Sequence, residues 1–324
     1  MNPDAANAAR CQARPGTYEA WYVTVNEPAQ GRGFWIRYTT LNPASGVAAE
    51  AHSALWAFAF DRADPASNWG AKALFPLHAL RVDLHPFAIR LQGAVLDRSG
   101  CSGELHSERG SARWDLRWES REPPFPFLRP RWQMLSSVAN IGAQPALTVT
   151  GTIEVNGRTH RLEGAPGGQQ HTWGTSHALA WNWGFASGKD FWVDGATSRV
   201  RSRFGPVLAG TAIGAKTGRE FFAFNGPVQV LRNRSPISPE AWDAHARMGE
   251  RILSVSVKPR RKDLIGVTYM DPRGGARFCY HTEVADLELR LTRRGETVAL
   301  ISRTAAAAFE YGAEVPVPGV PLVL

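Results

Sequence analysis

The sequence has no long hydrophobic run, although 44% of its 324 residues are hydrophobic. No stretch reaches the roughly 18 to 20 consecutive apolar residues that a transmembrane helix requires. Residues 1–14 also lack the basic segment followed by an apolar segment that marks a secretory signal. We therefore expect a soluble, cytoplasmic protein with no transmembrane segment. Residues 1–14 are alanine-rich and are expected to form a flexible N-terminus.

Cysteine is scarce and gives no sign of a metal or redox site. Cys11, Cys101 and Cys279 lie far apart, and none has the close partner that zinc ligation or a redox dithiol requires. His171 and His177 have no third ligand at a characteristic spacing. Glycine-rich phosphate loops, nucleophile elbows and dinucleotide fingerprints are also missing. The sequence therefore predicts that the protein needs no metal and no organic cofactor.

The charge is basic but dispersed. Lysine and arginine number 37 against 29 acidic residues, which gives a formal net charge of +8. These basic residues are scattered along the chain, and only residues 258–262 form a cluster. Because no nucleic-acid recognition module accompanies the charge, we expect no nucleic-acid partner. Peripheral contact with an anionic membrane surface stays open.

Helical periodicity is also rare, and alternation with period two takes its place. Short segments rich in aromatic and β-branched residues follow one another, bounded by glycine, proline, asparagine or aspartate, which is typical of consecutive antiparallel strands. In residues 111–120, Trp114, Leu116 and Trp118 alternate with charged residues, which predicts a strand with one buried face. The sequence therefore predicts an all-β protein.

The predicted strands fall into two sets. Asn156-Gly157 is a strong type I′ hairpin signal near the end of the first set, and a glycine-rich run at residues 164–168 separates it from the second. Two β-barrels in tandem are expected, over residues 15–165 and 166–324, and the similar size of the sets suggests a duplication. The predicted strands are 18–25, 34–39, 54–60, 111–120, 146–154 and 158–162, then 181–185, 191–196, 207–215, 220–225, 251–257, 264–270, 277–291 and 298–310.

Two segments depart from the strand pattern. Ser238 as an N-cap, with Pro239 at the first helical position, predicts one short helix over residues 240–250. The proline-rich residues 122–130 cannot pair inside a sheet, so we expect an ordered connection or a lid there.

Aromatic residues concentrate in one part of the sequence. Four of the twelve tryptophans, Trp173, Trp181, Trp183 and Trp192, fall within residues 169–195. Tryptophan faces in a closed cavity can hold a flat apolar ligand and stabilise a passing cation. The alternative is that they simply fill the ends of the barrels.

Asp194 follows three apolar residues, Phe191, Trp192 and Val193. If its side chain points inward, burial raises the pKa of its carboxyl, which could then donate a proton to a double bond. The alternative is that Asp194-Gly195 is only a turn at the end of a strand.

Several short motifs together resemble one superfamily. They are Tyr18-Glu19-Ala20-Trp21-Tyr22, Phe34-Trp35-Ile36-Arg37-Tyr38, His171-Thr172-Trp173-Gly174, Trp181-Asn182-Trp183 and Phe309-Glu310-Tyr311-Gly312. The chain resembles the carotenoid 1,2-hydratases, the tocopherol-cyclase-like proteins and their lipocalin-like relatives. The resemblance extends from about residue 17 to residue 312.

The resemblance implies two lipocalin-like barrels with a cavity near their junction, and acid-catalysed addition of water to an isoprenoid double bond without a cofactor. It implies catalytic roles for His171 and Asp194 and a ligand-binding role for Trp173. Trp21 and Tyr38, in the early motifs, join Trp181, Trp183 and Trp192 as candidate ligand-binding residues. Two positions depart from the pattern, because Gln170 stands where the hydratases have an acidic residue and Trp192 replaces a tyrosine.

Three functions remain open from the sequence. In the first, the protein is a hydratase or cyclase in which protonated Asp194 acts on a double bond, the tryptophans hold the cation and His171 orients Asp194 or the nucleophile. In the second, the protein carries a small apolar molecule, such as an isoprenoid, a lipid or a polyketide, in a barrel cavity without chemistry. In the third, the barrels are filled and the protein is structural or stress-protective.

Overall fold

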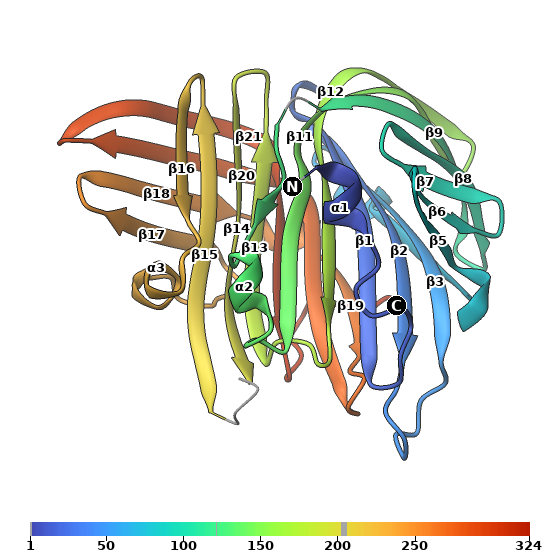
Figure 1. Cartoon of the computed structure of the whole chain (residues 1–324). Coiled ribbons are helices and arrows are strands. Elements are labelled where there is room, and N and C mark those ends of the chain that lie inside the picture. Colours follow the sequence, from blue (N-terminus) through green and yellow to red (C-terminus); the bar gives the residue numbers. More distant parts are fainter. Residues whose placement is uncertain (1, 121, 202–205) are drawn as a thin grey trace.

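The computed structural model describes residues 2–120, 122–201 and 206–324 and confirms the all-β prediction (Figure 1). Its strands form two antiparallel sheets that lie side by side. The helices of the described residues are short: α1 (Pro3–Asn7), α2 (Pro130–Gln133) and α3 (Pro227–Arg232). None of them has the length and apolarity that crossing a membrane would require.

The first sheet contains twelve strands. Its order is β4 (Trp69–Pro76), β3 (His52–Asp61), β2 (Arg32–Asn42), β1 (Thr17–Glu27), β12 (Arg158–Gly174), β11 (Val138–Val155), β9 (Gly110–Ser120), β8 (Gly100–Ser107), β7 (Ala94–Asp97), β6 (Phe87–Leu91) and β5 (Arg81–Leu84), and β10 (Phe125–Pro126) pairs with β11.

The second sheet repeats this order in nine strands. It runs β16 (Glu220–Phe224), β15 (Val207–Thr217), β14 (Phe191–Arg201), β13 (Ala180–Ser187), β21 (Glu296–Ala313), β20 (Ala276–Arg293), β18 (Arg251–Lys258) and β17 (Trp242–Met248), and β19 (Ile265–Met270) pairs with β20. By position in this order, β13 corresponds to β1, β14 to β2, β20 to β11 and β21 to β12. The shared order supports the duplication that the sequence suggests.

Side chains fill the interior of each curled sheet. The first is packed with residues such as Trp114, Leu116 and Val149, and the second with Trp242, Phe222 and Leu289. A third apolar cluster lies between the two sheets and contains these aromatic residues among others: Tyr22, Trp35, Trp56, Phe58, Phe125, Trp183, Trp192 and Tyr269. β1 and β2 are therefore buried on both faces along most of their length, as are residues 182–187 of β13 and 192–195 of β14.

The predicted helix over residues 240–250 is wrong, because residues 242–248 form strand β17. Trp242, Ala244 and Ala246 are buried while the residues between them are exposed, which is the period of a strand. The Ser238 hydroxyl does accept a bond from the Glu240 backbone N–H, but this bond closes a turn before the strand. Pairing with β18 therefore favours a strand over a helix in residues 242–248.

The connections agree with the sequence only in part. Asn156 and Gly157 both have positive φ and join β11 to β12, which confirms the predicted hairpin. The proline-rich segment does pair with a sheet, since β10 is hydrogen-bonded to β11 and Phe125 is buried between the sheets. β12 runs on to Gly174, past the glycine-rich run at residues 164–168.

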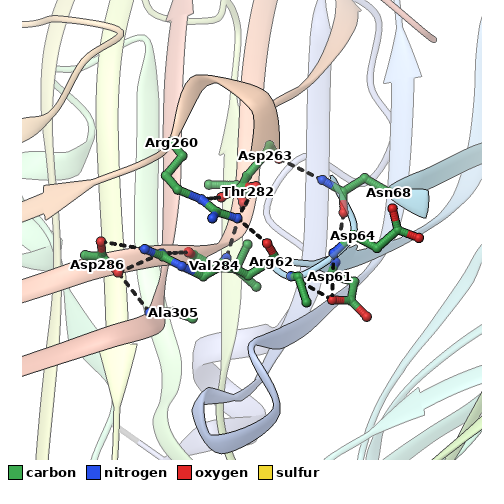
Figure 2. A network of polar contacts seen from close by, with 11 residues as sticks. Asp61, Arg62, Asp64, Asn68, Arg260, Asp263, Thr282, Val284, Asp286 and Ala305 are labelled. Atoms are coloured by element: carbon green, nitrogen blue, oxygen red, sulfur yellow. Dashed lines mark hydrogen bonds and ion pairs between the residues drawn. The ribbon is translucent and has the colours of Figure 1, made fainter. Parts of the chain in front are cut away.

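Charged residues join the two sheets at one edge (Figure 2). Arg62, which follows β3, forms two hydrogen bonds with Asp286 of β20, at 2.7 and 2.9 Å. Arg260, in the basic cluster of residues 258–262, binds both carboxylate oxygens of Asp263 and donates to the Arg62 carbonyl. Part of the basic cluster therefore serves as an internal bridge.

Candidate active site

A small cavity of about 70 Å³ lies between the two sheets. Both sheets contribute to its wall, with β1, β2, β11 and β12 on one side and β13, β14, β19 and β21 on the other. Its lining residues are Tyr18, Tyr22, Trp35, Arg37, Val138, Asn140, Thr172, His177, Ala178, Trp181, Trp183, Ala196, Tyr269 and Glu310. Aromatic rings and two opposite charges, those of Arg37 and Glu310, thus face one cavity.

A larger apolar groove of about 220 Å³ adjoins this cavity. Residues of α2, α3, β11, β14 and β15 line it, Leu231 and Trp132 among them. Val138, Asn140 and Ala196 line both the groove and the cavity. A ligand could therefore lie in the groove with one end in the cavity.

Asp194 lies on β14, one inward position before Ala196, and is completely buried. Its Oδ1 accepts a hydrogen bond from Nε1 of Trp183 at 3.1 Å, and its Oδ2 accepts one from Nε2 of Gln170 at 3.0 Å. Burial raises the pKa of the Asp194 carboxyl to about 7, although these hydrogen bonds act in the opposite direction. Gly142 makes room for the carboxyl, because a Cβ atom there would lie 2.6 Å from Oδ2.

A second acidic group, Glu310 on β21, lines the cavity. One of its oxygens accepts a hydrogen bond from Nε1 of Trp181 at 3.1 Å, and the other lies 3.4 Å from Nδ1 of His281. His281 also contacts Glu283 through Nε2 at 2.9 Å. Burial alone would raise the pKa of Glu310, but the bonds and charges from His281, Arg37 and Trp181 lower it.

The environment shifts the pKa of the other two members of this network as well. Burial lowers the pKa of His281, but its bonds to Glu283 and Glu310 outweigh burial and raise it. Burial raises the pKa of Glu283 to about 7. The cavity is therefore bordered by one carboxyl whose pKa is lowered, Glu310, and lies next to another whose pKa is raised, Asp194.

Four of the residues predicted from the sequence lie together between the sheets. Trp181 and Trp183 line the cavity, and Trp183 binds Asp194 directly. Trp192 is buried one inward position before Asp194 on β14 and packs against Phe125. The Asp194-Gly195 turn that the sequence left open does not form, since both residues lie inside a strand.

The other four predicted residues lie elsewhere. His171 and Trp173 point to the opposite face of β12 from Gln170, where His171 contacts Glu19 and the Ala6 carbonyl oxygen, both at 2.8 Å. The ring of Trp21 stacks on His171 and bonds to the Asn7 carbonyl oxygen. Tyr38 is in the core inside the first curled sheet, and its hydroxyl donates to the Val95 carbonyl oxygen. The structure thus does not bring His171 to Asp194.

The N-terminal segment covers this second group. α1 packs against β11, and the side chain of Asn7 is buried and donates to Gln169 at 3.0 Å. The His171–Glu19 pair is therefore enclosed by residues 5–11, since the backbone N–H groups of Arg10 and Cys11 also donate to Glu19.

Arg37, His281, Glu283 and Glu310 are not among the candidate site residues predicted from the sequence, although Arg37 and Glu310 lie within motifs that carry the resemblance. A signal for Arg37 exists, because Phe34-Trp35-Ile36-Arg37-Tyr38 and Phe191-Trp192-Val193-Asp194-Gly195 begin with the same two residues and share a pattern. The strand pairings make these segments equivalent: Arg37 pairs with Tyr22 of β1, and Asp194 with Phe185 of β13. Comparing the two halves of the chain could have identified Arg37.

The two-sheet fold has a precedent among solved structures. A Nitrosomonas europaea protein proposed to be an AttH superposes with a TM-score of 0.53 at 15% identity, over 92% of this chain and 93% of that one. At such low identity the likeness establishes the fold alone. Kievitone hydratase from Nectria haematococca gives a TM-score of 0.46 at 8% identity, over 96% of this chain and 91% of that one.

Sequence relatives extend over nearly the whole chain. The chain is 25% identical over 317 residues to the uncharacterized protein Rv0493c of Mycobacterium tuberculosis strain H37Rv, covering 94% of this chain and 92% of the relative. The uncharacterized protein MT0513 of strain CDC 1551 matches equally well. No family model matches the chain.

Proposed function

We propose that this protein is a cofactor-independent enzyme that adds water, or a hydroxyl group of the substrate itself, to a double bond of a small, mainly apolar molecule held between the two sheets. The observation that carries the proposal is Asp194, a fully buried carboxyl with a pKa near 7 that is bonded to a tryptophan lining the cavity. A carboxyl that stays protonated near neutral pH can act as a general acid.

The cavity between the sheets agrees with the resemblance, which implies a cavity near the junction of the two halves, and differs from the barrel cavity of the carrier hypothesis. The interiors of both curled sheets are packed with side chains, and the cavity lies between the sheets. In the proposed complex, the apolar part of the substrate occupies the groove and its double bond reaches past Ala196 toward Asp194. The faces of Trp183, Trp35 and Tyr269 then surround the reacting carbons.

The proposed reaction begins with transfer of the Asp194 proton to one carbon of the double bond. A positive charge develops on the other carbon, and the aromatic faces of the cavity stabilise it. Glu310, whose pKa is lowered, accepts a proton from the water or hydroxyl that attacks this carbon. Glu310 then releases this proton to solvent, and Asp194 takes one up from solvent, which restores both carboxyls. The reverse sequence would eliminate water.

The proposal gives to His281 the positioning role that the sequence analysis expected for His171. His281 contacts Glu310 and is stacked on Trp35 at 4.1 Å between ring centroids, so it is the histidine that can orient a carboxyl at the cavity. His171 is confined to the far face of β12 by its bonds to Glu19 and the Ala6 carbonyl oxygen. We therefore propose His281 as the positioning residue.

Measuring turnover and ligand binding separately tests this proposal. A panel of isoprenoid and polyketide alkenes is incubated with the protein in ¹⁸O-labelled water, and hydrated or cyclised products are detected by mass spectrometry. Asp194→Asn should reduce turnover by roughly a hundred- to ten-thousand-fold while ligand affinity changes little. Turnover of the native protein should also fall as the pH rises above about 7.

The matched control is Asp243→Asn, because Asp243 is an exposed aspartate on β17, in the same half of the chain. It should leave turnover unchanged. Undiminished turnover in Asp194→Asn would contradict the acid role. Binding without turnover in the native protein would instead favour the carrier function.

A further inference from the structure

Arg37 is a buried cation whose guanidinium has no hydrogen-bonding partner among the described residues. Its side chain lines the cavity, and the residue is only 7% exposed. Its Nε and Nη1 atoms are buried and donate to no acceptor, and within residues 2–120, 122–201 and 206–324 it forms no ion pair. An unpaired buried charge is expensive, because the lost hydration is not replaced.

A second buried arginine, Arg277, does form hydrogen bonds and ion pairs and can be compared with Arg37. Arg277 is 8% exposed, close to the value for Arg37. Its Nε donates to the Ala178 carbonyl oxygen at 3.0 Å, and its Nη2 lies 3.3 Å from Glu314. The fold thus satisfies one buried guanidinium and leaves the other with free donors facing a cavity.

Aromatic rings surround Arg37 but cannot satisfy it. The centre of its guanidinium lies 4.4 Å from the ring centroid of Tyr269 and 5.3 Å from that of Trp35. Such rings attract the charge, but they do not accept the in-plane N–H bonds of a guanidinium. The hydroxyl of Tyr269 is also buried, and among the described residues it has no oxygen or nitrogen partner and lies near the thiol of Cys279. Two unsatisfied polar groups therefore meet at the same end of the cavity.

The surroundings of this end are basic. Arg37, Tyr269 and His177 also line an adjoining pocket of about 40 Å³ that contains Lys72. Burial and the charge of Arg37 lower the pKa of Lys72 to about 8. Glu310 faces the same cavity, and the charge of Arg37 helps to lower its pKa, while one of its oxygens accepts a bond from Trp181 and the other lies 3.4 Å from Nδ1 of His281. No carboxylate of the described residues forms an ion pair with Arg37.

We propose that Arg37 binds a carboxylate of the ligand, so that the substrate is a small unsaturated carboxylic acid with an apolar chain. The planar fork of a guanidinium matches a carboxylate with two parallel N–H···O bonds. The Tyr269 hydroxyl donates a third bond. The ligand chain then passes Asn140, Val138 and Ala196 into the apolar groove. This inference rests on the proposed ligand site but not on the proposed reaction.

The test compares geranate with geranamide, the neutral amide of the same shape. Binding is measured by isothermal titration calorimetry, and the native protein should prefer geranate. Arg37→Gln should weaken geranate binding by about ten- to hundred-fold and geranamide binding by less than about three-fold. Asp194→Asn should keep the preference for geranate, which separates this inference from the acid mechanism.

A second measurement needs no ligand. Because Arg37 forms no hydrogen bond or ion pair among the described residues, Arg37→Gln should lower the unfolding midpoint in urea much less than Arg277→Gln does. These results, together with loss of the geranate preference, support the proposal. Equal binding of both compounds, no binding of either, a preference that survives Arg37→Gln, or destabilisation of Arg37→Gln as large as that of Arg277→Gln would overturn it.

Discussion

The two halves of this protein share a strand order but differ in chemistry where they meet. Trp35 and Trp192 occupy equivalent buried positions between the sheets. Two residues further along, the first half has Arg37 and the second has Asp194. A core position tolerates only apolar residues of suitable size, whereas a position beside a cavity can change its charge. At this equivalent position between the sheets, the two halves therefore carry opposite charges.

The same contrast appears on β11 and β12 and on their counterparts β20 and β21. Asn140 of β11 accepts a hydrogen bond from Thr172 of β12 at 2.6 Å. The equivalent pair of the second half is His281 and Glu310, as the pairings with Gly174 and Gly312 show. A neutral pair thus faces an ionisable pair across the cavity. Together these positions make an asymmetric site from two similar sheets.

The largest expected effect comes from breaking the ionisable pair. His281→Gln leaves Glu283 and Glu310 buried without their cation, so the free energy of unfolding should fall by about 3–5 kcal/mol. Asn140→Ala, the equivalent change in the first half, removes one neutral hydrogen bond and should cost about 0.5–1.5 kcal/mol. Urea unfolding of both variants checks this, and equal losses would contradict the contrast.

A smaller effect should appear in the pH dependence of stability. The Asp194 pKa is raised to about 7 in the folded protein, while an aspartate in the unfolded chain titrates near about 4. Folded protein therefore holds a proton that unfolded chain has lost, and this contribution to stability disappears as the pH rises from about 4 through 7.

In the Asp194→Asn variant, residue 194 cannot titrate. The variant should therefore lack the part of the stability loss that Asp194 causes as the pH rises. Relative to the native protein, the variant should gain stability from pH 5 to pH 8, by an amount on the order of 2–4 kcal/mol. Glu283, with a pKa also near 7, should give both proteins a residual slope. Urea unfolding at several pH values tests this, and parallel profiles would argue against a buried neutral Asp194.

The smallest effect should come from the bridge between the halves. In the Arg62–Asp286 pair the side chains are 18% and 39% exposed, so solvent screens their attraction. Arg62→Gln should cost about 1 kcal/mol, and the loss should shrink in high salt. A loss comparable with that of His281→Gln would mean that the edge network of Figure 2, and not the cavity network, holds the halves together.

Local patterns predicted most of the scaffold. Alternation in residues 111–120 marked β9 because Trp114, Leu116 and Trp118 face the barrel core and the residues between them face solvent. The same reasoning failed at residues 240–250, where a capping serine and a proline resemble a helix start but the chain pairs with β18. Cross-strand pairing overrides such local signals.

The site was predictable only in part, because its residues come together from both halves. Asp194, Trp181 and Trp183 lie close in sequence and form one group in space. Arg37 and Glu310 reach the cavity through a register that no local pattern contains. His171 was misplaced because a strand turns alternate residues to opposite faces, so that its neighbour Gln170 reaches Asp194 instead.

A structure of the protein with bound geranate tests the central claim most directly. The account predicts that the ligand lies between the two sheets, with its carboxylate bonded to Arg37, its chain in the groove beside Ala196 and a double bond directed toward Asp194. Geranate located inside either curled sheet, or bound away from both Arg37 and Asp194, would contradict it.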